Sequence, residues 1–143
     1  MRLWHFKLIS YLDRQRLLGQ HRECCALRGN GWGKKHATVD YVFKYNPARL
    51  VAYHWLVMDE MKRRGYNPDA KWEVPNWRGS TLEFDKMFVL DDDLVEEYYY
   101  YGQKGETIYP EHNDAYLKEC IDNLRDKGVD TSCIEVAMAC HLA

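Results

Sequence analysis

The chain has 143 residues, of which 46% are hydrophobic and 29% charged, and its formal net charge at pH 7 is −2. This length suits one domain with a hydrophobic core, and the composition is that of an ordinary globular protein rather than a disordered or fibrous one. The longest apolar run, near residues 50–58, is too short to cross a bilayer, and we find no signal peptide, so we expect a cytoplasmic protein whose five cysteines stay reduced.

The first half of the chain predicts two long helices. The first should cover residues 11–28 and stop at Gly29-Asn30-Gly31. The second should begin at Asn46-Pro47, because asparagine is a good N-cap and proline is tolerated at the first helical position. It should end at Gly65, since glycine often follows a last helical turn and the cations at 62–64 suit the negative end of the helix dipole.

The second half predicts shorter helices. Ser80-Thr81-Leu82-Glu83 has the form of a capping box, as does Ser132-Cys133-Ile134-Glu135, which should open a short last helix. The aspartates at 91–93 should cap a helix that carries the tyrosines at 98–101, and residues 110–127 have a helical pattern. Alternating strand patterns are scarce, so the sequence predicts a compact all-α fold in a single domain.

The first helix separates two faces at 100° per residue. Glu23 falls with Arg16 and Gly19 on the outer face, whereas an inner face should pack in the core, formed by Leu17, Leu18, His21, Cys24 and Cys25. A glycine inside a helix costs about 1 kcal/mol relative to alanine, and one reason to accept it is close approach by a bulky ligand such as a nucleic-acid backbone. Glu23 is then either a catalytic acid or base among cations, or one half of an exposed ion pair.

Charge is distributed unevenly along the chain. Residues 1–64 hold 13 Lys and Arg against five Asp and Glu, whereas residues 65–143 hold seven cations against 17 anions. Such a division suggests a basic surface for a polyanion such as DNA, although the two halves could instead pair with each other. The acidic C-terminal part is most simply a solvated surface, and a further alternative is that it covers the basic groove.

His21, Cys24 and Cys25 could be read as metal ligands. No CxxC pair or HExxH motif supports that interpretation, and adjacent cysteines point in different directions. Small thiols pack readily in a core. We therefore expect neither a metal nor another cofactor, and we expect His54, on an apolar helix face, to be a core residue.

Several motifs in order resemble the pyrimidine-dimer DNA glycosylases with abasic-site lyase activity, the phage endonuclease V type. They lie within residues 1–102 and comprise Asp13-Arg14-Gln15-Arg16-Leu17 before Arg22-Glu23, Lys34-Lys35-His36, Phe43-Lys44, the helix end at 62–67, Pro75-Asn76-Trp77-Arg78-Gly79 and the aromatic run Tyr98 to Gly102. The resemblance implies a helical core over 1–102, and residues 103–143 would be a helical extension packed on the same domain. Three positions depart from the family: Arg2 stands where it has the small residue whose amine is the nucleophile, Arg16 where it has a histidine and Ala26 where it has an arginine.

The resemblance also implies a chemistry and a set of site residues. In such enzymes an N-terminal amine attacks sugar carbon C1′, expels the base and forms an imine, while a glutamate moves the protons. The family's nucleophile position matches Arg2, but methionine before a large residue is normally retained, so the amine should be that of Met1. The implied catalytic residues are Met1, Arg2 and Glu23, and the implied DNA-binding residues are Gln15, Arg16, Arg22, Arg28, Lys34, Lys35, His36, Lys44, Tyr99 and Tyr100.

The predicted function is therefore that of a DNA repair glycosylase and abasic-site lyase. Its partner would be double-stranded, damaged DNA; it would be a monomer in the cytoplasm, associated with the nucleoid when bound, with no membrane partner. Two other classes stay open: a non-catalytic nucleic-acid-binding protein of the same fold, and a small protein-interaction module. Steep salt dependence of DNA binding would exclude the interaction module, and cleavage of abasic-site DNA would distinguish the enzyme from the binding protein.

Overall fold

A computed structural model describes residues 2–35 and 38–142, apart from the side chains of residues 140–142. The chain order is η1 (Phe6–Tyr11, a 3-10 helix), α1 (Arg14–Arg28), η2 (Asp40–Lys44), α2 (Ala48–Arg63), η3 (Ala70–Glu73), α3 (Asp92–Gln103), α4 (Asp114–Asp126) and α5 (Ser132–Leu142). The described residues form no strand, only an isolated bridge between Trp77 and Phe84. The all-α fold predicted from the sequence is confirmed, and no helix within the described ranges combines the length and the apolar character needed to cross a membrane.

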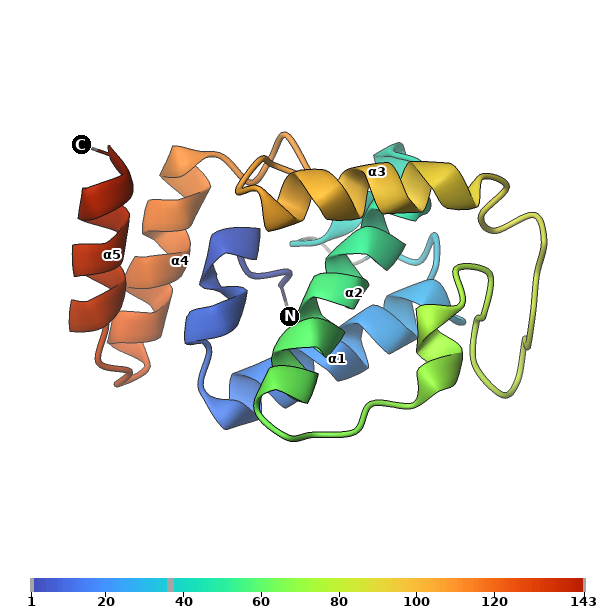
Figure 1. Cartoon of the computed structure of the whole chain (residues 1–143), viewed down its shortest axis with the longest axis horizontal. Helices are drawn as coiled ribbons and strands as arrows, with labels where there is room; N and C mark the ends of the chain where they lie inside the picture. The colour runs from blue at the N-terminus through green and yellow to red at the C-terminus, as the bar shows by residue number, and fades with distance from the viewer. Residues whose placement is uncertain (1, 36–37, 143) are drawn as a thin grey trace.

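The helices are arranged around a central pair. Helices α1 and α2 lie in the middle of the molecule, α3 packs across α2, and α4 and α5 stand side by side at one end (Figure 1). The long connection between α2 and α3 occupies the opposite end. The chain therefore places its two charged halves on different parts of one elongated body.

The helix ends predicted from capping residues are largely confirmed. The side-chain oxygen of Asn46 accepts from the backbone N–H of Ala48 at 2.9 Å, and Gly65 has a φ of +90°, which glycine adopts without strain. The carboxylate of Asp91 accepts from the N–H groups of Asp93 and Leu94 at the start of α3. These ends follow from local chemistry, which is why the sequence predicts them.

Two capping boxes did not form as predicted. The segment at 80–83 is a turn in which the N–H of Arg78 donates to the carbonyl of Glu83 and the N–H of Glu83 donates to the carbonyl of Gly79. Glu83 has a φ of +53°, so the chain reverses there instead of entering a helix. The last helix does begin at Ser132, but its first N–H donates to Asp130, so the aspartate takes the capping role.

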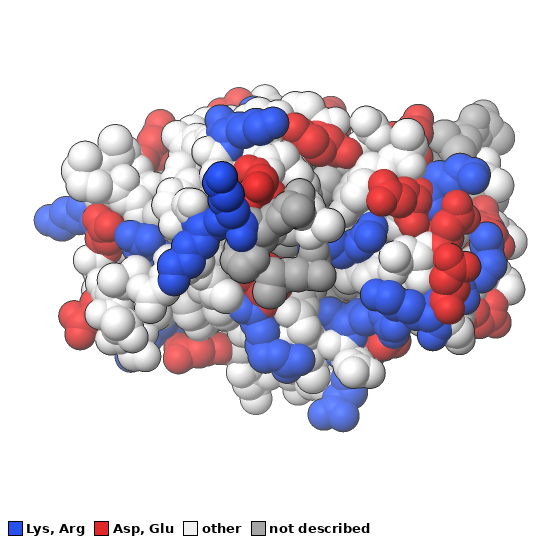
Figure 2. All heavy atoms as spheres, turned by 180° about the vertical axis from the view of Figure 1, so that it is seen from behind, with Lys and Arg blue, Asp and Glu red and all other residues white. Residues whose placement is uncertain are grey.

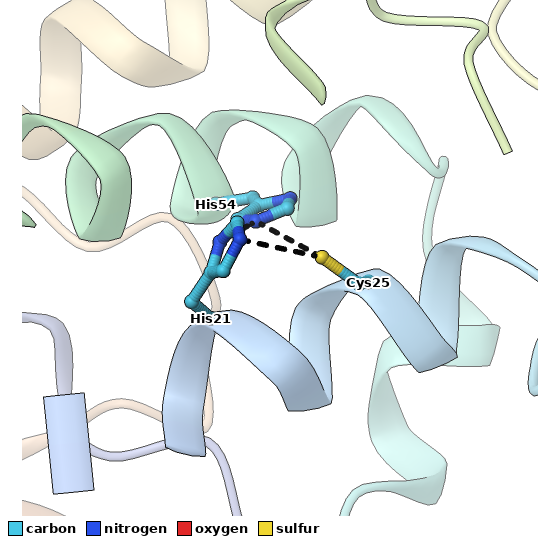
Figure 3. Close-up of side chains that lie close together, drawn as sticks. All are labelled: His21, Cys25 and His54. Carbon is cyan, nitrogen blue, oxygen red and sulfur yellow. Dashed lines mark hydrogen bonds between the residues drawn. The ribbon is translucent and has the colours of Figure 1, made fainter. Parts of the chain in front are cut away.

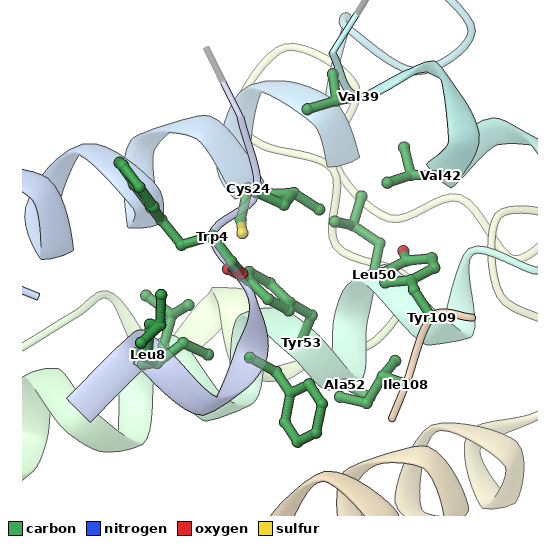
Figure 4. Close-up of a cluster of buried hydrophobic side chains, with 14 of the residues drawn as sticks. Trp4, Leu8, Cys24, Val39, Val42, Leu50, Ala52, Tyr53, Ile108 and Tyr109 are labelled. Carbon is green, nitrogen blue, oxygen red and sulfur yellow. Dashed lines mark hydrogen bonds between the residues drawn. The ribbon is translucent and has the colours of Figure 1, made fainter. Parts of the chain in front are cut away.

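The hydrophobic core joins the first and last parts of the chain. Leu3 and Leu8 at the N-terminus are fully buried, and buried side chains of α4 and α5 belong to the same cluster. Figure 4 shows side chains of the N-terminal segment, α1, α2 and residues 108–109 converging on Tyr53, itself fully buried. The core thus fixes the start of the chain between α1 and α2, and it holds residues 103–143 against the same body.

Two buried histidines reinforce this junction. The rings of His5 and His112 stack with their centroids 5.4 Å apart, and the Tyr41 hydroxyl lies 2.7 Å from Nε2 of His112. Burial lowers the pKa of His5 to about 4 and that of His112 to about 3. Both rings are therefore neutral at pH 7 and stack without charge repulsion, which links the N-terminal segment to the chain just before α4.

Candidate active site

A polar pocket of about 460 Å³ opens between the N-terminal segment, α1 and α4. It contains the predicted catalytic carboxylate, that of Glu23, and four other predicted site residues: Arg2, Gln15, Arg16 and Arg22. Its full lining is Arg2, Trp4, Gln15, Arg16, Gly19, Gln20, Arg22, Glu23, Thr38, Asn123 and Lys127. The outer face of α1 therefore faces a pocket, and Gly19 is part of its lining. A ligand can approach the helix closely only where the surface is open in this way.

Gln20 fixes the start of the chain on α1. Its Nε2 donates to the carbonyl of Arg2 at 3.0 Å, and its Oε1 accepts from the N–H of Trp4 at 2.7 Å. The buried Tyr53 hydroxyl lies within 2.9 Å of the same Oε1 and 2.7 Å from the carbonyl of Trp4. Because Gln20 is only 3% exposed, these bonds are shielded from water, and they hold residues 2–4 one helical turn from Glu23.

Glu23 lies in the same pocket as Arg2. Its side chain is half-buried, and its Oε1 is shielded from solvent. The helical spacing of three residues brings Glu23 onto the face of α1 that carries Gln20. The structure thus places Arg2 and Glu23, two of the three residues that the sequence nominated as catalytic, in one pocket.

Gly19 leaves space on the helix surface. A Cβ placed on it would have Nη2 of Arg22, at 3.8 Å, as its nearest neighbour among the described residues. That separation is ordinary van der Waals contact, so packing within these residues gives no reason for a glycine. A ligand that approaches the helix backbone supplies such a reason.

Cations surround the pocket, and their present partners hold them weakly. Arg16 pairs with Asp13 at 3.0 Å and Arg2 with Glu119 at 3.8 Å, and in both pairs the carboxylate is at least a third exposed. Exposed pairs contribute little, so either guanidinium can exchange its carboxylate for a phosphate. Figure 2 shows Lys and Arg side chains gathered across the middle of one face, with acidic side chains toward the end formed by α4 and α5.

Arg28 is not a DNA contact, and the prediction for this residue is wrong. Its side chain is fully buried and donates to the carbonyls of Trp72 at 2.6 Å and Val74 at 2.8 Å, with longer contacts to those of Pro75 and Trp77. Burial lowers the pKa of the guanidinium to about 10, so it remains protonated at pH 7. Arg28 therefore holds the segment after α2 against the end of α1.

A chain of hydrogen bonds runs from Arg28 to Cys25, and Figure 3 shows its last three members, His54, His21 and Cys25. Nη1 of Arg28 lies 2.9 Å from Nδ1 of His54, Nε2 of His54 lies 2.8 Å from Nδ1 of His21, and Nε2 of His21 lies 3.7 Å from Sγ of Cys25. Burial lowers the pKa of both histidines and raises that of the Cys25 thiol to about 12, so all three are neutral at pH 7. Because an arginine can only donate, each ring donates through Nε2 in turn.

The same three side chains have ligand atoms within 4.8 Å of one another, as a metal site would. A metal on Nε2 of His54 would leave a proton on Nδ1, facing the Arg28 donor. The Nδ1–H of His54 and the Nη1–H of Arg28 would then point at each other, and the metal ion would add a second positive charge beside the buried guanidinium. The chemistry of these groups fits a hydrogen-bonded core better than a cation, and His54 is the buried core residue that the sequence predicts.

The remaining predicted residues lie outside the pocket. Lys34, Lys35 and Lys44 are exposed in the connection from α1 to α2. Tyr99 donates to the carboxylate of Asp59, and Tyr100 lies on the exposed side of α3. We therefore treat contacts between these residues and DNA as a proposal. Two further predicted residues, Met1 and His36, lie outside the described residues.

Five pocket residues were not predicted: Trp4, Gln20, Thr38, Asn123 and Lys127. Gln20 lies three positions before Glu23, a spacing that could have suggested a shared face. Asn123 and Lys127 are four residues apart, a spacing that also suggests a shared helix face. Only the tertiary fold reveals that this face of α4 reaches the pocket.

Comparison with known proteins identifies a family. No curated protein and no solved structure matches the chain. The model of a family described as pyrimidine dimer DNA glycosylase matches residues 1–74, more than half of the chain, and this stretch includes both Arg2 and Glu23. The chain therefore belongs to the pyrimidine dimer DNA glycosylase family.

Proposed function

We propose that this protein excises pyrimidine dimers or related lesions from duplex DNA and then cleaves the strand at the resulting abasic site. The amine of Met1 is the nucleophile, and Glu23 is the acid and base. The observation that carries the proposal is the shared pocket of Arg2 and Glu23, with the carbonyl of Arg2 bonded to Gln20 one turn away along α1.

An N-terminal amine suits this reaction. Its pKa is roughly 7.7–8, compared with about 10.4 for lysine, so a useful fraction is neutral at pH 7 and can attack carbon. The nitrogen bonds to C1′ as the bond from C1′ to the base breaks, and the base leaves with the electron pair and a proton. Opening of the sugar ring between C1′ and O4′ then gives the imine.

Glu23 supplies the proton transfers that follow. As a carboxylate it removes a proton from C2′, and the electrons form a double bond as the C3′–O bond to the phosphate breaks. Water hydrolyses the imine and restores the amine. The buried Oε1 of Glu23 supports this role, because proton transfer proceeds best from a group held in place and partly shielded from solvent.

The arginines around the pocket have a separate task. Access to C1′ requires that the lesion be extruded or the duplex kinked, and contacts to the phosphate backbone offset this cost. Arg16 and Arg22 flank Gly19 on α1, so phosphates bound to them would lie over the open helix surface. Lys34, Lys35 and Lys44 extend this contact, and Tyr99 and Tyr100 would meet the flanking duplex.

Strand cleavage by the untagged protein tests the proposal. The wild type should nick both ultraviolet-irradiated and abasic-site duplexes without added metal. Gly19→Ala should nick both more slowly, by about tenfold, because its methyl group occupies the space needed by the DNA; a displacement of about 1 Å can cost about 100-fold.

Stability provides the control for this variant. Alanine favours a helix by about 1 kcal/mol over glycine, so Gly19→Ala should unfold at an equal or higher temperature. Slower nicking by a more stable protein cannot come from misfolding. A wild type that binds DNA in a salt-dependent manner but nicks neither substrate would identify a binding protein instead of an enzyme.

A further inference from the structure

Helix α4 contributes two side chains to the candidate active site. Asn123 and Lys127 are four residues apart, so they lie on one face of the helix, and both line the pocket that contains Arg2 and Glu23. They lie beyond residues 1–74, which the family model matches. The family match therefore assigns them no role.

Several contacts fix α4 at the pocket. The Tyr116 hydroxyl donates to the carbonyl of Leu3 at 2.6 Å, and Glu119 faces Arg2 at 3.8 Å. On its inner side the helix buries Leu117 and Leu124 in the common core. The face of α4 that carries Tyr116 and Glu119 is thus positioned against residues 2–4, beside the pocket that Asn123 and Lys127 line.

Asn123 carries an acceptor that the described residues leave unused. Its Oδ1 is buried, and no donor within the described part of the chain bonds to it. A buried carbonyl oxygen without a donor is unfavourable, and native proteins keep few of them. The oxygen is closed to solvent here, and because Asn123 itself lines the pocket, rotation of its side chain brings Oδ1 to a donor on a bound ligand.

Lys127 adds a positive charge beside this acceptor. The residue is exposed, and its Nζ lies 5.6 Å from the centre of the Trp4 ring, whose other cationic neighbour is Arg2 at 5.4 Å. Phosphate attracts such a lysine as a point charge, without the need for a fixed fork geometry. The acidic half of the chain thus presents Lys127 and the amide of Asn123 to the pocket. The carboxylate of Glu119, on the same helix, faces Arg2.

We propose that Asn123 and Lys127 form a DNA-binding subsite, in which Lys127 pairs with a phosphate next to the lesion and Asn123 Oδ1 accepts a hydrogen bond from the nucleotide at the lesion. The donor is either the N3–H of a thymine or a hydroxyl of the opened sugar. This inference rests on the proposed function. It also replaces the alternative that the C-terminal part merely covers the groove: residues 103–143 complete the site.

The Asn123→Leu variant tests the hydrogen bond. Leucine keeps a similar size but removes the acceptor, so the protein should be at least as stable in urea while single-turnover cleavage falls about tenfold, the effect of one hydrogen bond. A loss on both abasic-site and dimer duplexes identifies a sugar hydroxyl as the donor, and a loss on dimer DNA alone identifies the base. Unchanged cleavage on both substrates overturns the role of Asn123.

The Lys127→Ala variant tests the phosphate contact through the affinity for duplex DNA, without a cleavage assay. The dissociation constant for duplex DNA should rise about three- to tenfold, and the slope of log K against log salt should become shallower by about 0.9. Lys118→Ala is the matched control, because Lys118 is 81% exposed and lies on α4 away from the pocket, and its binding should equal that of the wild type.

The two proposals fail in different ways. A wild type that nicks neither substrate contradicts the proposed catalysis, whereas the binding measurements still decide whether Asn123 and Lys127 touch DNA. An active wild type whose Lys127→Ala and Lys118→Ala variants share its affinity and salt slope contradicts the subsite and leaves the catalytic proposal intact.

Discussion

Glu23→Gln should lower single-turnover cleavage of an abasic-site duplex by at least about 100-fold, the lower end of what a general acid or base contributes. Glutamine keeps the size and polarity of the side chain but cannot take a proton from C2′. Loss of a negative charge among Arg2, Arg16 and Arg22 removes a repulsion from phosphate, so DNA affinity should not fall. A fluorescence titration and an end-labelled cleavage assay on one preparation measure both quantities.

A second glutamate provides the matched control. Glu96 is exposed on α3 and does not line the pocket, so Glu96→Gln makes the same chemical change elsewhere. Its cleavage rate should stay within about threefold of the wild type, since surface substitutions seldom matter. Equal rates for wild type and Glu23→Gln would remove Glu23 from the mechanism, whatever the affinity.

Arg28→Met should reduce the free energy of unfolding by about 3 kcal/mol or more. The substitution removes donors from four backbone carbonyls and from Nδ1 of His54, and each buried acceptor left without a donor costs about 1–3 kcal/mol. With a urea dependence of about 1–3 kcal/mol per molar, the unfolding midpoint should fall by 1 M or more.

Arg22→Met is the comparison, because Arg22 is exposed on the same helix. It should change the stability by less than about 0.5 kcal/mol. The opposite pattern, in which Arg28→Met is as stable as the wild type but binds DNA less well, would restore Arg28 as a phosphate contact and contradict its place in the core.

The sequence predicts what depends on neighbouring residues. The ends of α2 and α3 follow from Asn46, Gly65 and Asp91, whose capping chemistry acts within a few residues. The inner and outer faces of α1 follow from helical periodicity, with Leu17 and Cys24 buried and Glu23 facing the pocket. This much suffices to propose an all-α fold and one candidate catalytic side chain.

The sequence does not predict what depends on distant residues. Arg28 looks like one more cation in a basic stretch, and only the carbonyls of residues 72–77 show why it is buried. Gln20 is an ordinary polar residue until the backbone of Arg2 and Trp4 meets it. The contribution of α4 likewise requires the core that joins the two ends of the chain.

Reduction of the imine gives the most direct test of the account. The untagged protein, mixed with abasic-site duplex and borohydride, should form a covalent complex, and peptide mapping should find the sugar on the amine of residue 1. Blocking that amine by an N-terminal tag should prevent trapping. A label on a lysine side chain, or no covalent complex from a protein that binds the duplex, would contradict catalysis by the chain's own amine beside Glu23.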